Sequence, residues 1–215
     1  MTHVVLIDNH DSFVYNLVDA FAVAGYDCTV FRNTVPVETV LAADPDLICL
    51  SPGPGYPHDS GFMMDLIGQT LGSVPLLGIC LGYQALIEYH GGTVEPCGPV
   101  HGTTDRMLLN DAGVAHPVFA GLATDIEPDR PDVPGRLVPV GRYHSLGCVR
   151  APAGIVALAT CASDIGDVIM AAETDDGMAI GLQFHPESVL SPTGPVILSR
   201  CVDALLDKTN KDKDK

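Results

Sequence analysis

The sequence predicts an α/β domain in which a mostly parallel β-sheet is flanked by helices, with antiparallel strands added in the C-terminal half. In the first half, short and nearly continuous apolar runs alternate with segments of helical periodicity, as in parallel sheets that are buried on both faces. In the second half, the apolar runs follow one another with few helical segments between them. At 215 residues, one such domain buries a sufficient core without metals or disulfides.

The N-terminal half supplies the alternating elements. The apolar run Val4–Ile7 predicts a first strand, and the spacing after it predicts a helix that Asp11 or Ser12 caps and Gly25 ends. Ligands of such sheets bind beyond the carboxyl ends of the strands, so residues there are the first candidates for a site. The same reasoning predicts further strands at Cys28–Phe31, Leu47–Leu50 and Pro75–Ile79. It predicts further helices at Pro36–Ala42, Phe62–Leu71 and Leu81–His90.

The C-terminal half is dominated by strands. Thr124–Gly135, rich in proline and acidic residues, predicts an exposed and mobile loop. Pro195–Leu206 has the pattern of a terminal amphipathic helix, and the charged residues after it indicate a frayed tail. We therefore expect one domain over residues 1–206 and a flexible tail over 207–215. The expected strands are Met107–Leu109, Leu137–Val140, Ile155–Thr160, Val168–Ala172 and Ala179–Phe184.

The charge balance argues against anionic partners. The chain has 11 basic and 27 acidic residues and a formal net charge of −16, which repels phosphate backbones and anionic lipids. No apolar stretch approaches the length that spans a bilayer, and the first apolar run is too short for a signal peptide and lacks its basic flank. We expect neither nucleic acid nor a membrane as a partner.

The cysteines form neither a disulfide pattern nor a metal pattern. Their number, seven, is odd, and no two of them have the C-x-x-C spacing or another metal-ligand spacing. We therefore expect no metal site in this chain. Reduced thiols indicate the cytoplasm as its compartment.

The most informative segment is GICLG at residues 78–82, where an apolar strand passes into a helix. Its pattern matches the G-x-S-x-G elbow, in which glycines permit a tight turn that exposes the central side chain. The N-terminus of the helix also favours a thiolate over a thiol. Most cysteines are small buried hydrophobes, but none of the others stands between two glycines. Cys80 is therefore the candidate nucleophile.

A cysteine nucleophile needs a base and a carboxylate that orients the base. His185 and Glu187 supply both, on either side of Pro186. In an extended segment, side chains two positions apart point to the same side, and proline restricts the backbone between them. A single His-x-Glu pattern is common by chance, and its weight here comes from its combination with Cys80.

A third segment, SPGPG at residues 51–55, follows a predicted strand. Its prolines stiffen the loop, and its glycines let the backbone approach a ligand, so its N–H groups are candidates for half of an oxyanion hole. The alternative is a rigid turn without a ligand. The segment is not a phosphate-binding loop, because it lacks both the G-x-G-x-x-G pattern and the Gly-Lys-Ser/Thr ending.

These three segments, with DNHDSF at residues 8–13 and RYHSL at 142–146, resemble in their order the class I (triad) glutamine amidotransferases. The resemblance covers nearly all of residues 1–206 and implies the flavodoxin-like sheet of that family. The first and last motifs are most similar to the chorismate-linked branch, which comprises the glutamine subunits of anthranilate synthase and of aminodeoxychorismate synthase.

The resemblance implies a role for each residue of the site. Cys80 attacks the side-chain amide of glutamine, His185 shuttles the proton and Glu187 orients the histidine. A γ-glutamyl thioester on the cysteine is then hydrolysed, while the backbone N–H groups of Gly53 and Leu81 stabilise the oxyanion. By the same resemblance, the residues that contact glutamine are Gly53, Pro54, Gly55, Gln84, Ser145 and Leu146.

The resemblance also implies the partners. The substrate is L-glutamine, and the ammonia goes to a chorismate-binding synthase subunit, component I of anthranilate synthase, in tryptophan biosynthesis. No cofactor is expected in this chain, and magnesium is expected in the partner. We favour anthranilate as the product, but the residues leave aminodeoxychorismate open. Two other readings are a stand-alone cysteine hydrolase of γ-glutamyl compounds and a silent binding subunit.

Two positions depart from the family pattern. Tyr83 stands where the family most often has histidine, and Thr103 stands where lysine is usual. Neither position belongs to the triad. Both departures are expected to alter contacts with a partner surface.

Overall fold

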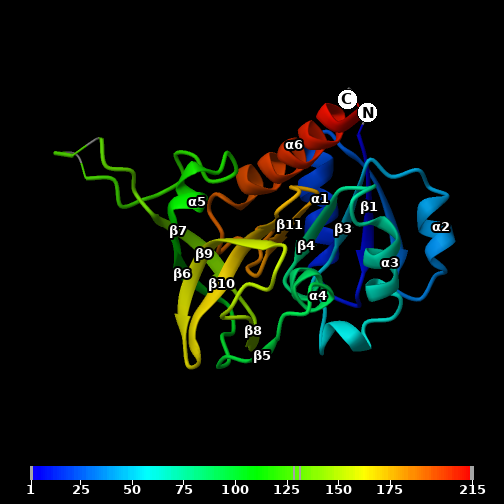
Figure 1. Ribbon diagram of the computed structural model, residues 1–215, viewed down its shortest axis with the longest axis horizontal. Helices are drawn as coiled ribbons and strands as arrows, with labels where there is room; N and C mark the ends of the chain where they lie inside the picture. The colour runs from blue at the N-terminus through cyan, green and yellow to red at the C-terminus, as the bar shows by residue number, and fades with distance from the viewer. Residues whose placement is uncertain (1, 128, 131, 214–215) are drawn as a thin grey trace.

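The computed structural model of the chain describes residues 2–127, 129–130 and 132–213. Within these ranges, the main sheet has nine strands in the order β2-β1-β3-β4-β11-β10-β9-β6-β7. Helices cover both faces of its first half, and the second half extends as a long twisted hairpin region (Figure 1). The predicted α/β class, with a parallel core and antiparallel additions, is confirmed.

One half of the sheet is parallel and buried. Its strands pair in register, so that the carboxyl ends of β3, β4 and β11 lie at the same edge. Alternate residues of each strand point to opposite faces: Val4 and Leu6 pack into one core, and Val5 and Ile7 into another. The bounds are β1 His3–Asp8, β2 Asp27–Arg32, β3 Leu47–Leu50, β4 Leu76–Ile79 and β11 Ala179–Leu182.

The other half is antiparallel. β10 pairs with β11 on one side and with β9 on the other, and β6 joins β9 to β7. A small two-stranded sheet of β5 and β8, which the sequence did not predict, lies beside it. The bounds are β5 Glu95–Pro96, β6 Thr103–Leu109, β7 Leu137–Arg142, β8 Leu146–Gly147, β9 Ile155–Ser163 and β10 Gly166–Thr174.

The helices divide between the two faces of the parallel half. α1 and α6 pack together on one face, whereas α2, α3 and α4 contribute to the core of the other. The short helix α5 packs on β9 and β6. The bounds are α1 Val14–Val23, α2 Val37–Leu41, η1 Pro57–Asp59, α3 Met63–Thr70, α4 Leu81–Tyr89, α5 Asp111–Ala115 and α6 Gly194–Lys213.

The predicted start of α1 is wrong. Phe13 occupies the N-cap position, and no side chain caps the helix. The Asp11 carboxylate instead accepts the backbone N–H of Phe13 at 2.7 Å, so it closes a turn one step before the helix, as aspartate side chains often do. Ser12 is exposed and also makes no cap.

The C-terminal end also differs from the prediction. α6 continues to Lys213 and not to Leu206, because residues 207–213 contain no glycine or proline that would break a helix. The predicted helix end at Leu206 is therefore wrong, the flexibility of the tail stays a prediction, and residues 214–215 lie outside the described residues. The exposure of the loop at 124–135 is confirmed for its described residues except Gly135, which is partly buried. No helix in the described part of the chain is long and apolar enough to span a bilayer.

Candidate functional site

The elbow around Cys80 has the strained geometry that its glycines permit. Cys80 lies between β4 and α4 with φ 50° and ψ −100°, a backbone region that residues other than glycine rarely adopt. A Cβ atom at Gly78 would lie 2.7 Å from the carbonyl carbon of Gly82, and one at Gly82 would collide with the carbonyl oxygen of Leu50. Larger residues at both positions would force the turn open, so the predicted elbow is confirmed.

The sulfur of Cys80 lies at a cavity of about 410 Å³, a volume typical of small-molecule sites. The cavity lies beyond the carboxyl ends of the parallel strands, where the fold class predicts a ligand. All residues that were expected to contact glutamine lie in its wall. The wall is formed by Gly53, Pro54, Gly55, Tyr56, Cys80, Gln84, Tyr143, His144, Ser145 and Leu146.

The loop that carries Gly53 is held by the opening motif of the chain. The hydroxyl oxygen of Ser51 accepts the backbone N–H of Asn9 at 3.0 Å, and the Asn9 side chain donates to the Ser51 carbonyl at 2.9 Å. A Cβ atom at Gly53 would lie 2.6 Å from the Cβ of Asn9 and 2.7 Å from the Cδ2 of Leu81. Only glycine lets this loop pack against the first residue of α4.

This packing brings the loop at Gly53 next to the start of α4. Leu81 is the first residue of α4, so its N–H has no acceptor within the helix. Gly53 lies in van der Waals contact with the same residue. Gly53 and Leu81, whose amides were expected to form an oxyanion hole, are therefore neighbours, and the direction of their two N–H groups stays a prediction.

His185 and Glu187 are paired, but not along an extended segment. His185 Nδ1 and Glu187 Oε1 lie 2.7 Å apart, with 4% and 0% of the two side chains exposed. β11 ends at Leu182, and the N–H of Ser188 donates to the carbonyl of His185 at 3.2 Å. Pro186 therefore lies in a turn, and the turn, not a strand, brings imidazole and carboxylate together.

His185 is held in its protonated form. Burial by itself lowers its pKa, but hydrogen bonds and charges from Cys80 and Glu187 outweigh burial and raise the pKa to about 10. The rings of Phe13 and Tyr143 each lie with their centroids 5.0 Å from the imidazole. The raised pKa favours the imidazolium form of His185, whose side chain contacts that of Cys80.

A second histidine, His144, stays neutral and supports the opposite wall. Burial, followed by the charge of Arg142, lowers its pKa to about 4. Its Nδ1 donates to the carbonyl of Leu146 at 2.9 Å, and its Nε2 accepts from the Nε of Arg142 at 3.3 Å. Arg142 in turn pairs with Asp105 at 2.6 Å. The RYHSL motif thus fixes the carbonyl of Leu146.

Gln183 is a site residue that sequence reasoning missed. Its side-chain nitrogen lies 3.6 Å from the Sγ of Cys80, and its side-chain oxygen accepts from Gln84 at 3.1 Å. The nitrogen of Gln84 also donates to the Leu146 carbonyl at 3.1 Å. The available signal was a single polar residue in the otherwise apolar run at 179–184.

The two departures from the family pattern lie in different environments. Tyr83 is 1% exposed and packs on Gly181, so its expected contact with a partner surface is wrong: the first turn of α4 faces the core there. Its hydroxyl is buried and has no hydrogen-bond partner among the described residues. Thr103 is exposed at the start of β6, and its effect on a partner stays a prediction.

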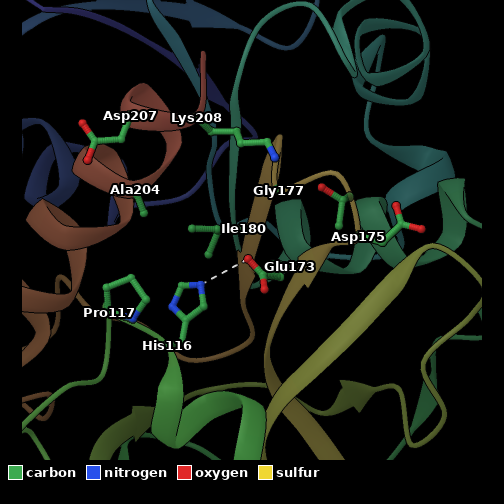
Figure 2. Close-up of a pocket in the computed structure, with 10 residues that line it drawn as sticks. His116, Pro117, Glu173, Asp175, Gly177, Ile180, Ala204, Asp207 and Lys208 are labelled. Atoms are coloured by element: carbon green, nitrogen blue, oxygen red, sulfur yellow. Dashed lines mark hydrogen bonds and ion pairs between the residues drawn. The ribbon is translucent and has the colours of Figure 1, made fainter. Parts of the chain in front are cut away.

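A second cavity, of about 350 Å³, lies at the amino end of β11. Figure 2 shows His116 and Glu173 facing each other in its wall, with Lys208 of α6 on the opposite side. His116 Nε2 and Glu173 Oε2 lie 3.1 Å apart. In the described part of the chain, no three His, Cys, Asp or Glu side chains are grouped so that they could hold a metal ion.

Comparisons with known proteins agree with this geometry. Residues 5–205 match the family Glutamine amidotransferase class-I. The chain is 83% identical to anthranilate synthase component 2 of Corynebacterium glutamicum, over 96% of this chain and 99% of the relative. It is 39% identical to the pyocyanine-specific anthranilate synthase component 2 of Pseudomonas aeruginosa, over 93% of this chain and 92% of the relative.

A solved structure shows the same fold at low sequence identity. It is a glutamine amidotransferase from Thermotoga maritima, with a TM-score of 0.64, 19% identity and coverage of 100% of this chain and 86% of that one. The family match spans the elbow, the loop at 51–55 and the His185–Glu187 pair. The chain belongs to the class I glutamine amidotransferase family.

Proposed function

We propose that this chain hydrolyses L-glutamine at Cys80 and supplies the ammonia to a chorismate-binding synthase subunit that makes anthranilate for tryptophan biosynthesis. The observation that carries the proposal is that the Cys80 elbow and the Gly53 loop border one cavity, while His185, paired with Glu187, contacts the Cys80 side chain. These groups are a nucleophile, a proton carrier with its orienting carboxylate, and oxyanion donors.

The first half of the reaction forms a thioester. The thiolate of Cys80 attacks the side-chain amide carbon of glutamine, and the oxyanion that develops is stabilised by the N–H groups of Gly53 and Leu81. The C–N bond breaks as His185 gives its proton to the leaving nitrogen, so that ammonia departs. The raised pKa of His185, about 10, means that the histidine carries the proton before the attack, and loss of the Cys80 charge on thioester formation removes one cause of that raised pKa, which favours release of the proton.

The second half releases glutamate. His185, now neutral, takes a proton from a water molecule that attacks the thioester carbon, and the Cys80 thiolate leaves. Glu187 accepts a hydrogen bond from His185 Nδ1 at 2.7 Å, which keeps Nε2 directed to the reacting atoms and stabilises each return to the imidazolium.

The choice of product rests on similarity. The relative with 83% identity is named anthranilate synthase component 2, which favours anthranilate over aminodeoxychorismate as the product of the complex. The name also supports a component I partner, and we propose that this partner binds chorismate and carries the magnesium. The seven cysteines are all free, which is consistent with our expectation of a cytoplasmic, reducing compartment.

Reconstitution tests the function. The chain is mixed with an anthranilate synthase component I and, separately, with the corresponding aminodeoxychorismate synthase component, and both products are assayed from chorismate with glutamine or with ammonium. We expect glutamine-dependent anthranilate synthesis in the first mixture, and glutaminase activity that rises strongly with the partner and chorismate. Glutamine hydrolysis at the same rate with and without a partner would support the stand-alone hydrolase instead.

A further inference from the structure

The side chain of Gln183 contacts both Cys80 and Gln84, a residue in the wall of the cavity. It follows β11 directly, and its side chain is completely buried. The side-chain nitrogen lies 3.6 Å from the Sγ of Cys80, and the side-chain oxygen accepts from Gln84 at 3.1 Å. One amide group therefore contacts both the reacting sulfur and a residue of the cavity wall.

The orientation of Gln84 follows from this contact. Its side-chain nitrogen donates to two carbonyl oxygens, those of Gln183 and Leu146, and a primary amide has only two N–H donors. The side-chain oxygen of Gln84 is thus its remaining polar atom, and no side-chain hydrogen bond within the described residues uses it. Gln84 lies in the cavity wall, so this oxygen is free to accept an N–H from a bound molecule.

The orientation of Gln183 is coupled to that of Gln84. If the Gln183 amide were flipped, its NH2 group would face the NH2 group of Gln84, and two buried donors would oppose each other without an acceptor. The observed orientation avoids this cost and directs the NH2 group of Gln183 to Cys80. A buried N–H donor next to a sulfur stabilises its negative charge, and it does so more strongly in a low-dielectric site.

We propose that Gln183 is a positioning residue with two functions: its oxygen holds Gln84 with an acceptor directed at the amide of the substrate, and its NH2 group holds and stabilises the Cys80 thiolate. The first function rests on the proposed function, because it assumes that glutamine is the substrate. The second does not, because it concerns only the sulfur.

Three variants separate the two functions. Gln183→Glu keeps an acceptor for Gln84 but removes the donor to Cys80 and places a negative charge beside the sulfur. Gln183→Met has a similar volume and removes both hydrogen bonds. Gln84→Met is the matched control, because it removes the group that is positioned but keeps the Gln183 amide, and with it a donor for the sulfur.

The first measurement is the rate at which iodoacetamide labels Cys80 in the isolated chain, followed by mass spectrometry. We expect both Gln183 variants to be labelled at least about tenfold more slowly than the native chain, and Gln84→Met to be labelled within about twofold of it. Thermal unfolding of each variant checks that it is folded. Labelling of both Gln183 variants at the native rate would overturn the contact with the thiolate, as would equal slowing in all three variants.

The second measurement is the KM and kcat for glutamine in the complex with the chorismate-binding component. Gln84→Met and Gln183→Met should raise KM by about tenfold, whereas Gln183→Glu should lower kcat and leave KM within about threefold. An equal rise of KM in both Gln183 variants would overturn the positioning of Gln84. If the native complex did not hydrolyse glutamine, the proposed function would fail, and the labelling rates would still decide the role of Gln183 at the sulfur.

Discussion

Two cavities of similar size lie at opposite ends of the central sheet, with volumes of about 410 and 350 Å³. The first is bordered by Cys80, whose backbone is strained and whose side chain contacts His185, a histidine with a raised pKa. The second contains the His116–Glu173 pair, in which the two groups satisfy each other and link the end of α5 to β10 (Figure 2). Volume therefore does not distinguish a reactive site from a structural gap.

The difference between the cavities comes from the direction of the strands. At the carboxyl ends of parallel strands, the chain turns into helices whose first N–H groups have no acceptor within the helix, and one such helix start, that of α4, directly follows Cys80 at the first cavity. The second cavity lies at the amino end of β11, and its wall includes three carboxylates, those of Glu173, Asp175 and Asp207. It offers no comparable group of donors.

The largest expected effect is at the nucleophile. Cys80→Ser should reduce glutamine-dependent synthesis by the complex by at least about 1,000-fold, because the variant lacks the thiolate that attacks the amide. Synthesis from added ammonium should remain. Cys28→Ser, which changes a partly exposed cysteine elsewhere, is the control and should keep both activities. Loss of both activities in Cys80→Ser would contradict the division of labour between the two subunits.

The second effect separates the proton carrier from its orienting carboxylate. His185→Ala should approach the loss seen for Cys80→Ser, whereas Glu187→Ala should retain more glutaminase activity, because a misoriented histidine can still transfer a proton. Single-turnover rates with glutamine measure this order. A greater loss in Glu187→Ala than in His185→Ala would show that the roles are assigned wrongly.

The third effect is a pH dependence of stability at the same cavity. The pKa of His185 in the folded chain, about 10, lies above its ordinary value of 6.5. Protonation of His185 therefore contributes stability that is fully present below about pH 6.5 and is lost as the pH rises through about 10. Glu187→Gln removes one cause of the raised pKa, so its melting temperature should fall less than that of the native chain over this range. Parallel curves would contradict the coupling.

The fourth effect tests the second cavity. Glu173→Ala should leave glutamine turnover within about twofold of the native rate, because the His116 pair lies at the end of the sheet away from Cys80. The Glu173 side chain is 27% exposed, so the pair should contribute at most about 1 kcal/mol, or roughly 2–4 °C in melting temperature. A large loss of turnover with an unchanged melting temperature would reveal a functional link between the cavities.

The smallest effect is expected at the C-terminus. Removal of residues 210–215, which include no apolar side chain, should change the melting temperature by less than about 2 °C and leave glutamine turnover unchanged. Residues up to Thr209 should be kept, because Leu205 is buried and Lys208 lies over Gly177 at the second cavity. Differential scanning calorimetry of the shortened chain provides the measurement, and a drop of many degrees would show that the end of α6 stabilises the fold.

Local chemistry explains why the central residues were predictable. An elbow needs glycine on both sides of its reactive residue for steric reasons. The segment GICLG therefore predicts that Cys80 is the exposed residue of such a turn, without knowledge of the rest of the fold. Alternating apolar runs likewise predict a parallel sheet, because both its faces are buried. The errors were local as well: Asp11 closes a turn in place of a helix cap, and the His185–Glu187 segment is a turn where extended backbone was expected.

By itself, the sequence determined the fold class and indicated Cys80, His185 and Glu187 as the candidate catalytic residues, because steric demands and chemical reactivity are properties of short segments. Only the tertiary structure decided which distant groups surround them. Gln183 lies 99 residues from Gln84 and 103 from Cys80 along the chain, and Tyr83 proved to be buried beneath Gly181. Which residues so far apart in the chain form hydrogen bonds depends on the order of the strands in the sheet. That order cannot be predicted from the spacing of residues along the chain.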